Sequence, residues 1–306
     1  MKVAELGEDR LIAKISRQLP AGAFVKRGVG DDCAVFRIDA RRDGLLASDM
    51  LVEGVHFSSQ SPAEQVGWKL LAVNLSDIAA MGGTPRAAVV SIGIPPSTPV
   101  GWVEKLYRGL GRCARAYGVS IVGGDTVRAP QRVADLSILG EVPAGKAILR
   151  TGARPGDWIL VTGRLGGSLK SGRHLSFKPR LKEAAALLKH CRPTAMMDLS
   201  DGLWIDLPRL CKASGVRAEV ETELVPRNRN CSTLQALTDG EDFELLLTVR
   251  PGHLRPLLRW AKRSLPCGLT PIGLMSARKQ GTPEVEWFDR MNQKLKMTPK
   301  GFQHFS

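Results

Sequence analysis

The chain has 306 residues, of which 43% are hydrophobic, 24% charged and 5% aromatic. This length allows one large or two ordinary domains, and these fractions are typical of globular proteins, so wholesale disorder and collagen-like repeats are excluded. Lysine and arginine outnumber aspartate and glutamate by 44 to 30, a net charge of +14. The basic residues are dispersed, without zinc-finger spacing or an aromatic RNA-binding cluster. A generally basic surface, or one that attracts anionic metabolites, is therefore favoured over nucleic-acid binding.

The chain shows no sign of a membrane or secreted location. Its longest apolar runs, such as residues 87–95, have the length of a strand and fall short of the roughly 18 residues of a membrane-spanning helix. The first residues, MKVAELGEDRLIAKI, mix acids and bases with apolar residues, which is typical of an amphipathic helix and not of a signal peptide. The six cysteines are scattered without a CxxC pair, so we expect small core residues and not a zinc site or disulfides. We expect a cytoplasmic protein with no membrane partner.

Hydrophobic periodicity divides the chain into alternating groups of helices and strands. It predicts helices at residues 4–19, 63–81, 99–117, 180–190, 202–214 and 252–264. Short β-branched runs predict strands at 33–38, 45–48, 87–94, 120–122, 134–142, 158–162, 217–221, 243–249 and 285–288. Because the two kinds do not alternate strictly, an α+β (mixed α/β) class is favoured over a doubly wound sheet. Turn residues at 143–145 predict a boundary between domains 1–143 and 144–306.

Acidic residues recur at predicted strand ends and helix starts, several of them beside glycines. The motifs are GVGDD at 28–32, ASD at 47–49, NLSD at 74–77, GGDT at 123–126, DLSDG at 198–202 and DGED at 239–242. Gathered carboxylates repel one another, so a fold that collects them needs a cation, and Mg²⁺ takes carboxylate oxygens together with substrate phosphates. Any one motif is also explained as an ordinary turn or helix cap. Their number in one chain indicates a metal-assisted phosphate site.

Asp77 is the strongest single candidate, since it shares one face of an otherwise apolar predicted helix with Asn74. The Walker A and protein-kinase motifs are absent from the sequence. Residues 109–114 match GxGxxA but lie within a predicted helix, so we discount a dinucleotide site there. Residues 163–168 follow a predicted strand, which is the context of an anion-binding loop. Among the five histidines, His56 is the one near an acidic motif.

Several longer motifs, taken in order, resemble those of a known family. They are GVGDDCAVF, SDMLVEGVHF, GWKLLAVNLSDIAAMGGTP, IVGGDTVR, RTGARPGDWILVTG, MDLSDGL, GEDFELLL and GFQHF. Their order and spacing are similar to the thiamine-monophosphate kinase family, of the aminoimidazole ribonucleotide synthetase-like superfamily. The resemblance implies a two-domain fold, usually a homodimer. The N-terminal sheet domain would form the dimer interface, a C-terminal α/β sandwich domain would follow it, and ATP would bind between the two.

The resemblance also implies a set of site residues. Metal ligands fall on Asp32, Ser48, Asp49, Asp77, Asp125, Asp198 and Asp201, of which Asp32, Asp77, Asp125 and Asp198 are the expected catalytic residues. ATP contacts fall on Gly124, Asp125, Arg150 and Ser200, and thiamine-phosphate contacts on His56, Glu241 and Phe302. The chain departs from the family in a shortened 163–195 segment, in Met50 where Thr is common, and in Asp239 where Gly is common.

The function that this resemblance implies is Mg²⁺-dependent transfer of the γ-phosphoryl group of ATP to thiamine monophosphate, giving thiamine diphosphate and ADP. Two unit charges 4 Å apart interact by about 4 kcal/mol at an effective dielectric of about 20, so several Mg²⁺ ions are expected between the anions. A phosphate monoester is largely deprotonated at neutral pH, so direct in-line transfer needs no catalytic base. We expect Asp32, Asp49, Asp77 and Asp125 to share one cleft.

Three other functions stay open from the sequence. Another ATP-dependent synthetase of the superfamily would share the aspartates, although selenophosphate synthesis is disfavoured because the first cysteine is Cys33. A metal-dependent phosphohydrolase could use similar carboxylates. A non-enzymatic binder of anions or nucleic acid is supported by the charge of +14 alone.

Overall fold

The computed structural model describes residues 2–20, 22–291 and 293–295. The chain divides into two compact units, neither continuous in sequence. Unit 1 comprises Met1–Asp31, Leu149–Ser168 and Cys191–Ser306, and unit 2 comprises Asp32–Ile148 and Leu169–His190. The domain boundary expected after residue 143 stays a prediction.

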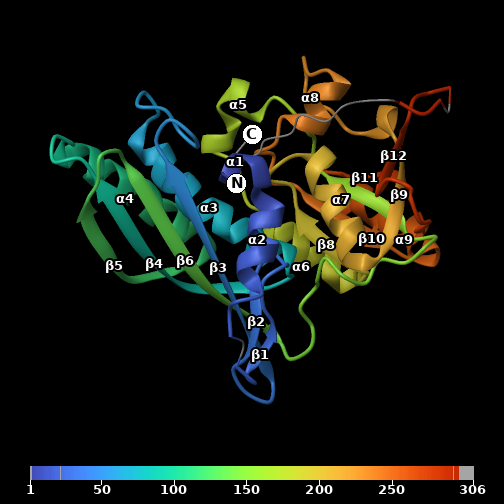
Figure 1. Cartoon of the computed structure of the whole chain (residues 1–306), viewed down its shortest axis with the longest axis horizontal. Helices are drawn as coiled ribbons and strands as arrows, with labels where there is room; N and C mark the ends of the chain where they lie inside the picture. Colours follow the sequence, from blue (N-terminus) through green and yellow to red (C-terminus); the bar gives the residue numbers. More distant parts are fainter. Residues whose placement is uncertain (1, 21, 292, 296–306) are drawn as a thin grey trace. The chain divides into compact units, whose positions relative to one another are not determined.

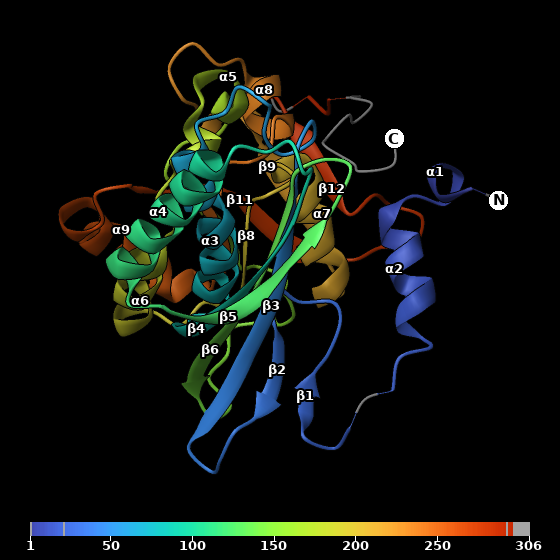
Figure 2. The ribbon, with the colours of Figure 1, turned by 90° about the vertical axis from the view of Figure 1, so that its left-hand side faces the viewer.

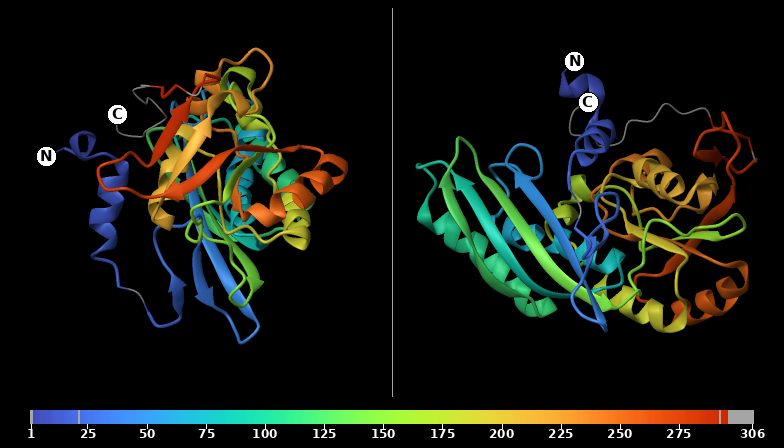
Figure 3. Two further views of the ribbon diagram at one scale, coloured as in Figure 1. Left: turned by 90° about the vertical axis from the view of Figure 1, so that its right-hand side faces the viewer. Right: turned by 60° about the horizontal axis from the view of Figure 1, so that its bottom comes forward.

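Unit 2 is built on a twisted sheet, seen in Figure 1 and in the right-hand view of Figure 3. Its strands lie in the order β2 (Ala34–Arg37), β3 (Arg42–Val52), β6 (Val133–Pro143), β4 (Thr84–Ile94) and β5 (Ser120–Arg128). Neighbouring strands are antiparallel except β4 and β5, which are parallel. The strands alternate between buried and exposed residues, so one face of the sheet packs on a core and the other is open.

Two helices lie on the packed side of this sheet, side by side in Figure 2. Helix α3 (Ala63–Ala80) is apolar almost all round, because it lies between the sheet and α4 (Val100–Tyr117). Helix α4 buries one stripe, which includes Leu106 and Leu110, against α3. On the open face of the sheet, Leu46, Met50 and Leu139 are exposed. Unit 2 also contains η1 (Arg173–Leu175) and α6 (Leu181–His190), both in contact with α3, and most of α5 (Ser168–Ser171).

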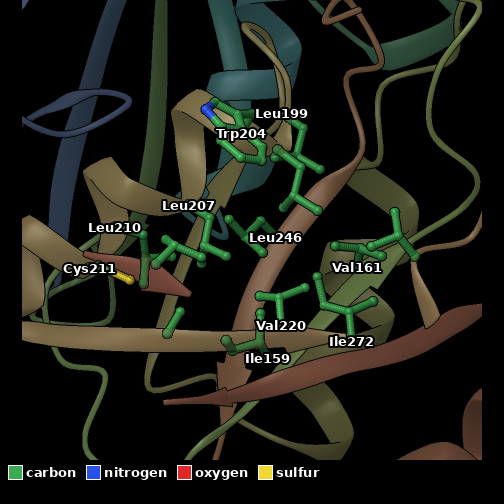
Figure 4. Close-up of a cluster of buried hydrophobic side chains, with 14 of the residues drawn as sticks. Ile159, Val161, Leu199, Trp204, Leu207, Leu210, Cys211, Val220, Leu246 and Ile272 are labelled. Atoms are coloured by element: carbon green, nitrogen blue, oxygen red, sulfur yellow. The ribbon is translucent and has the colours of Figure 1, made fainter. Parts of the chain in front are cut away.

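Unit 1 holds a second sheet, again mostly antiparallel. Its strand order is β12 (Val285–Phe288), β9 (Val216–Glu221), β11 (Leu269–Ala277), β7 (Trp158–Thr162), β10 (Leu245–Val249) and β8 (Ala195–Asp198). Helix α7 (Leu203–Ser214) packs its apolar stripe on this sheet, as Figure 4 shows for Leu207 and Leu210 beside Leu246 and Ile159. Trp204 of α7 stacks on Trp287 of β12 with ring centroids 4.7 Å apart. The remaining elements are α1 (Val3–Leu6), α2 (Glu8–Ser16), β1 (Val25–Arg27), η2 (Thr222–Leu224), α8 (Thr233–Thr238) and α9 (Pro251–Ser264).

All the predicted helices are present, and the α+β fold class is confirmed. The helix expected at 4–19 is broken at Gly7, whose φ of 77° leaves α1 and α2 on either side. The predicted strands are also present, but β3 and β5 extend well beyond their apolar runs. Strands β1, β8 and β11 were not predicted. Strand β1 has only three residues, β8 (AMMD) has no β-branched residue, and β11 contains a bulge between Pro271 and Gly273. Among the described helices, none is long and apolar enough to cross a membrane.

Candidate active site

Asp32 and Asp77 form the nucleus of the candidate site. Asp32 directly precedes β2, and Asp77 lies in the last turn of α3, where the neighbouring residues are buried. A carboxylate oxygen of one lies within 4.8 Å of a carboxylate oxygen of the other. Atom Oδ2 of Asp32 is shielded from solvent. Two such close carboxylates are the oxygen ligands that a divalent cation prefers, so the pair fits Mg²⁺.

Asp49 lies on the same side of the sheet as α3. It pairs across β3 and β6 with Leu136, which is fully buried on the α3 face. Since directly opposed residues in an antiparallel ladder point to the same face, the Asp49 side chain points to the face that carries α3. That Asp49 shares a cleft with Asp77 stays a prediction.

Asp125 and Ser48 lie on the opposite, open face. Asp125 pairs with Ser91 across β5 and β4, Ser91 pairs with Asp135 of β6, and all three help to line a cavity of about 300 Å³. The Ser48 hydroxyl donates to Oδ1 of Asp135 over 3.1 Å. Three strand spacings, about 14 Å, separate Asp49 from Asp125. Within one chain, the fold therefore does not bring Asp125 into the cleft that we expected it to share with Asp32, Asp49 and Asp77.

Two of the expected ATP contacts are fixed by their backbone surroundings. A Cβ on Gly124 would lie 1.7 Å from the carbonyl oxygen of Val90, so only glycine allows β5 to approach β4 here. In unit 1, the Arg150 amide donates to Oδ1 of Asp31 over 2.8 Å, and the Arg150 carbonyl accepts from the Ser214 hydroxyl over 2.7 Å. The backbone of Arg150 is thus held on both sides.

Hydrogen bonds of its ring and of its backbone hold His56 in the turn after β3. Its Nδ1 accepts from the Val52 amide over 3.1 Å, so the neutral ring carries its proton on Nε2. Its carbonyl accepts from the ammonium of Lys69 over 3.0 Å. Lys69 is completely buried on α3, and the sequence analysis did not assign it a role. The available signal was a charged residue inside an apolar helix pattern, which calls for a partner.

The acidic motif of unit 1 lies between β8 and α7. Asp198 is the last residue of β8 and is 3% exposed, and Asp201 precedes the start of α7. Arg209 forms ion pairs with both Asp201 and Asp206 of α7. Asp206 accepts the Asp201 amide over 3.0 Å, and burial followed by the Asp201 charge raises the pKa of the Asp206 carboxyl. The sequence analysis missed Asp206 and Arg209, although their spacing of three on a predicted helix was a usable signal.

The 163–168 loop is not an open anion-binding loop. The Gly166 amide donates to the Asp242 carboxylate over 2.9 Å, and the Gly167 amide donates to Oδ2 of Asp239 over 2.9 Å. These amides therefore bind carboxylates of the chain itself, and α5 after the loop has only four residues. Glu241 lies beside this loop with a left-handed φ of 55°. The expected substrate contact Phe302 lies outside the described residues.

Comparisons with known proteins place these residues in a family. The family model for the N-terminal domain of AIR synthase related proteins matches residues 30–142, and the C-terminal domain model matches residues 154–286. The thiamine-monophosphate kinase of Salmonella typhimurium is 35% identical over 98% of both chains. That of Synechococcus elongatus is 33% identical over 99% of this chain and 98% of the relative.

Solved structures agree with the sequence relatives. The structure described as AaThiL complexed with AMPPCP and TMP matches with a TM-score of 0.84 at 31% identity, covering 99% of both chains. The thiamine-monophosphate kinase of Stenotrophomonas maltophilia matches with a TM-score of 0.72 at 29% identity, covering 90% of this chain and 95% of the other. The chain belongs to the AIR synthase related proteins and, within them, to the thiamine-monophosphate kinase family.

Proposed function

We propose that this protein is a Mg²⁺-dependent kinase that transfers the γ-phosphoryl group of ATP to the phosphate of thiamine monophosphate. The observation that carries the proposal is the close Asp32–Asp77 pair, in a member of the thiamine-monophosphate kinase family. ATP and thiamine monophosphate are both anions, so they approach each other only where positive charge lies between them.

The proposed metal ligands come from both units. In unit 2 they are Asp32, Ser48, Asp49, Asp77 and Asp125, and in unit 1 they are Asp198 and Asp201. When bound, Mg²⁺ would neutralise the charge on the transferring phosphoryl group and on the acceptor phosphate. Asp32 and Asp77 fit this role because their oxygens are close and partly shielded, and Asp49 because it lies on the same face. The ion pair of Asp201 with Arg209 keeps that carboxylate oriented next to Ser200.

The remaining residues orient the two substrates. We assign Gly124, Asp125, Arg150 and Ser200 to ATP, and His56, Glu241 and Phe302 to thiamine monophosphate. The Nε2–H of His56 is a hydrogen-bond donor whose direction is set by the Val52 amide on Nδ1. Since the acceptor phosphate has already lost its proton at neutral pH, these groups need only align it for in-line attack, without a covalent intermediate.

We further propose that the protein acts as a cytoplasmic homodimer. The open face of the unit 2 sheet exposes several apolar side chains, namely Leu46, Met50, Val89, Val127 and Leu139. Such a patch is typical of an interface with another copy. Asp125 lies on this same face, so a partner sheet packed on it could receive Asp125 into its own site.

A competition assay tests the proposed reaction. The protein is incubated with ATP and Mg²⁺, and with thiamine monophosphate, thiamine or water as acceptor, while ADP and thiamine diphosphate are followed. We expect ADP to form only with thiamine monophosphate, in a one-to-one ratio to thiamine diphosphate, and to disappear when EDTA removes the metal. ADP formation without an acceptor would instead identify a phosphohydrolase.

A further inference from the structure

The backbone of Glu241 is held in an uncommon conformation. Its φ of 55° is left-handed, and Phe243, two residues later, has a φ of 50°. Neither residue is a glycine, so each conformation costs about 1–3 kcal/mol and persists only where the surroundings enforce it. Such strained positions are concentrated at ligand-binding sites. The structure therefore has to supply contacts that keep this turn in place.

Hydrogen bonds fix Glu241 from both sides. Its amide donates to the Ser200 carbonyl over 2.6 Å, and its carbonyl accepts from the Ser168 hydroxyl over 2.6 Å. Ser168 is completely buried at the end of the 163–168 loop. A Cβ on Gly240 would lie 2.9 Å from the Ser200 carbonyl oxygen, so the turn packs tightly on the segment after β8. One serine hydroxyl thus joins the 163–168 loop to the Glu241 turn.

Two carboxylates of the Glu241 turn hold the loop that carries Ser168. Asp242, 2% exposed, accepts the Gly166 amide, and Asp239 accepts the Gly167 amide. Hydrogen bonds therefore join the 163–168 loop to the Glu241 turn. Two backbone amides of the loop donate to carboxylates of the turn, and the Ser168 hydroxyl donates to the Glu241 carbonyl.

We propose that Ser168 and Asp239 are positioning residues that hold Glu241 in the orientation in which it binds the thiamine portion of the substrate. The inference rests on the proposed function, since that function assigns Glu241 to thiamine monophosphate. Ser168 acts directly on the Glu241 carbonyl. Asp239 acts one step further away, by fixing the Gly167 amide beside Ser168.

The test compares substrate constants in point variants of the full chain. Ser168→Ala is expected to raise the KM for thiamine monophosphate about tenfold, equivalent to about 1.4 kcal/mol, while kcat and the KM for ATP change less than about twofold. Asp239→Ala should raise the same KM about threefold. Asp239→Asn should restore it, because the amide oxygen still accepts from Gly167. Ser171→Ala, at an exposed serine of the same helix, is the matched control and should match the parent chain.

Calorimetric titration with thiamine monophosphate, without ATP, separates this inference from the proposed function. If the parent chain binds no thiamine monophosphate, both fail. If Glu241→Gln weakens binding while Ser168→Ala and Asp239→Ala leave it unchanged, only the positioning role fails. An equal rise in the KM values for ATP and thiamine monophosphate would indicate a general loss of structure and would also overturn the positioning role. Should Ser168→Ala fold poorly, the Asp239→Ala and Asp239→Asn pair decides alone, because Asp239 lies nearer the surface.

Discussion

A backbone contact determines which nitrogen of the neutral His56 ring carries the proton. Its Nδ1 accepts from the Val52 amide, so in the neutral ring Nε2 carries the proton, and Nε2–H is the donor that we propose for the substrate. The sequence placed His56 near an acidic motif, but it could not tell the two nitrogens apart, because their roles depend on which backbone amide the turn presents to the ring. The distinction can be tested with side chains that mimic one nitrogen each.

We expect His56→Ala to raise the KM for thiamine monophosphate about tenfold with little change in the KM for ATP, since about one charge-assisted hydrogen bond is lost. Asn mimics the Nδ1 position and Gln the Nε2 position. His56→Gln should therefore retain more affinity for thiamine monophosphate than His56→Asn. Steady-state kinetics with each substrate varied in turn provides the measurement, and a better Asn variant would contradict the assignment of Nε2.

Substitution of Asp77 gives the most direct test of the proposed metal site. Asp77→Asn keeps the shape of the side chain but removes the charge that would hold a cation next to Asp32. Turnover should fall more than about a hundredfold, since even partners of metal ligands contribute about 10- to 100-fold. Calorimetry should show weaker Mn²⁺ binding in the presence of ADP, and circular dichroism should be unchanged. Asp39→Asn, in an exposed turn, is the control; normal turnover in the Asp77 variant would refute the site.

Helices α3 and α4 cross at glycines, where neither helix carries a side chain. This crossing explains the glycine motif at residues 109–114. A Cβ on Gly109 would lie 1.8 Å from the Glu64 carbonyl oxygen, and a Cβ on Gly67 would lie 1.9 Å from the Leu106 carbonyl oxygen. The glycines let the two backbones touch. The apparent dinucleotide motif is thus a helix-packing site; its position inside a predicted helix had only argued against a dinucleotide site.

Gly109→Ala should destabilise the protein by about 2–3 kcal/mol, because a methyl group cannot fit without separating the helices. Gly111, two residues later on α4, meets only the flexible end of Arg115, at 3.4 Å. Gly111→Ala should leave the melting temperature unchanged or raise it slightly, through a gain of about 0.5–1 kcal/mol in helix propensity. Thermal unfolding of the two variants side by side tests this, and equal melting temperatures would contradict the packing role.

Helices and strands were predictable from the sequence where burial imposes a local hydrophobic pattern. The periodic patterns of α3 and α4 come from burial of one face or of the whole helix, so the sequence predicted both to within about a residue. Strand β5 has few buried residues and was predicted only at its first three positions. It is held by pairing with β4, a partner that no local pattern records. For the same reason the sequence motifs identified the aspartates as candidates but could not assign Asp125 to the face opposite Asp49.

The position of Asp125 links the proposed metal site to the proposed dimer. Asp49 and Asp125 are separated by two intervening strands and point to opposite faces of one sheet. If both belong to one metal site, a second copy must supply one of them. The exposed apolar face around Asp125 is where that copy would pack. A site built from one chain and a site built from two chains therefore predict different activities when inactive variants are mixed.

Asp77→Asn and Asp125→Asn should each be inactive alone, and mixing them should restore activity if Asp125 serves the partner's site. A mixed dimer then holds one site with both native aspartates and one with neither. Random exchange makes about half of the dimers mixed, so the mixture should reach about a quarter of the parent activity per chain. The variants are mixed under mild denaturant, refolded and assayed, and a mixture of Asp77→Asn with Asp32→Asn is the control that should stay inactive. If the Asp77 and Asp125 mixture also stays inactive although size-exclusion chromatography shows dimers, each site draws Asp125 from its own chain, and the two-chain site is refuted.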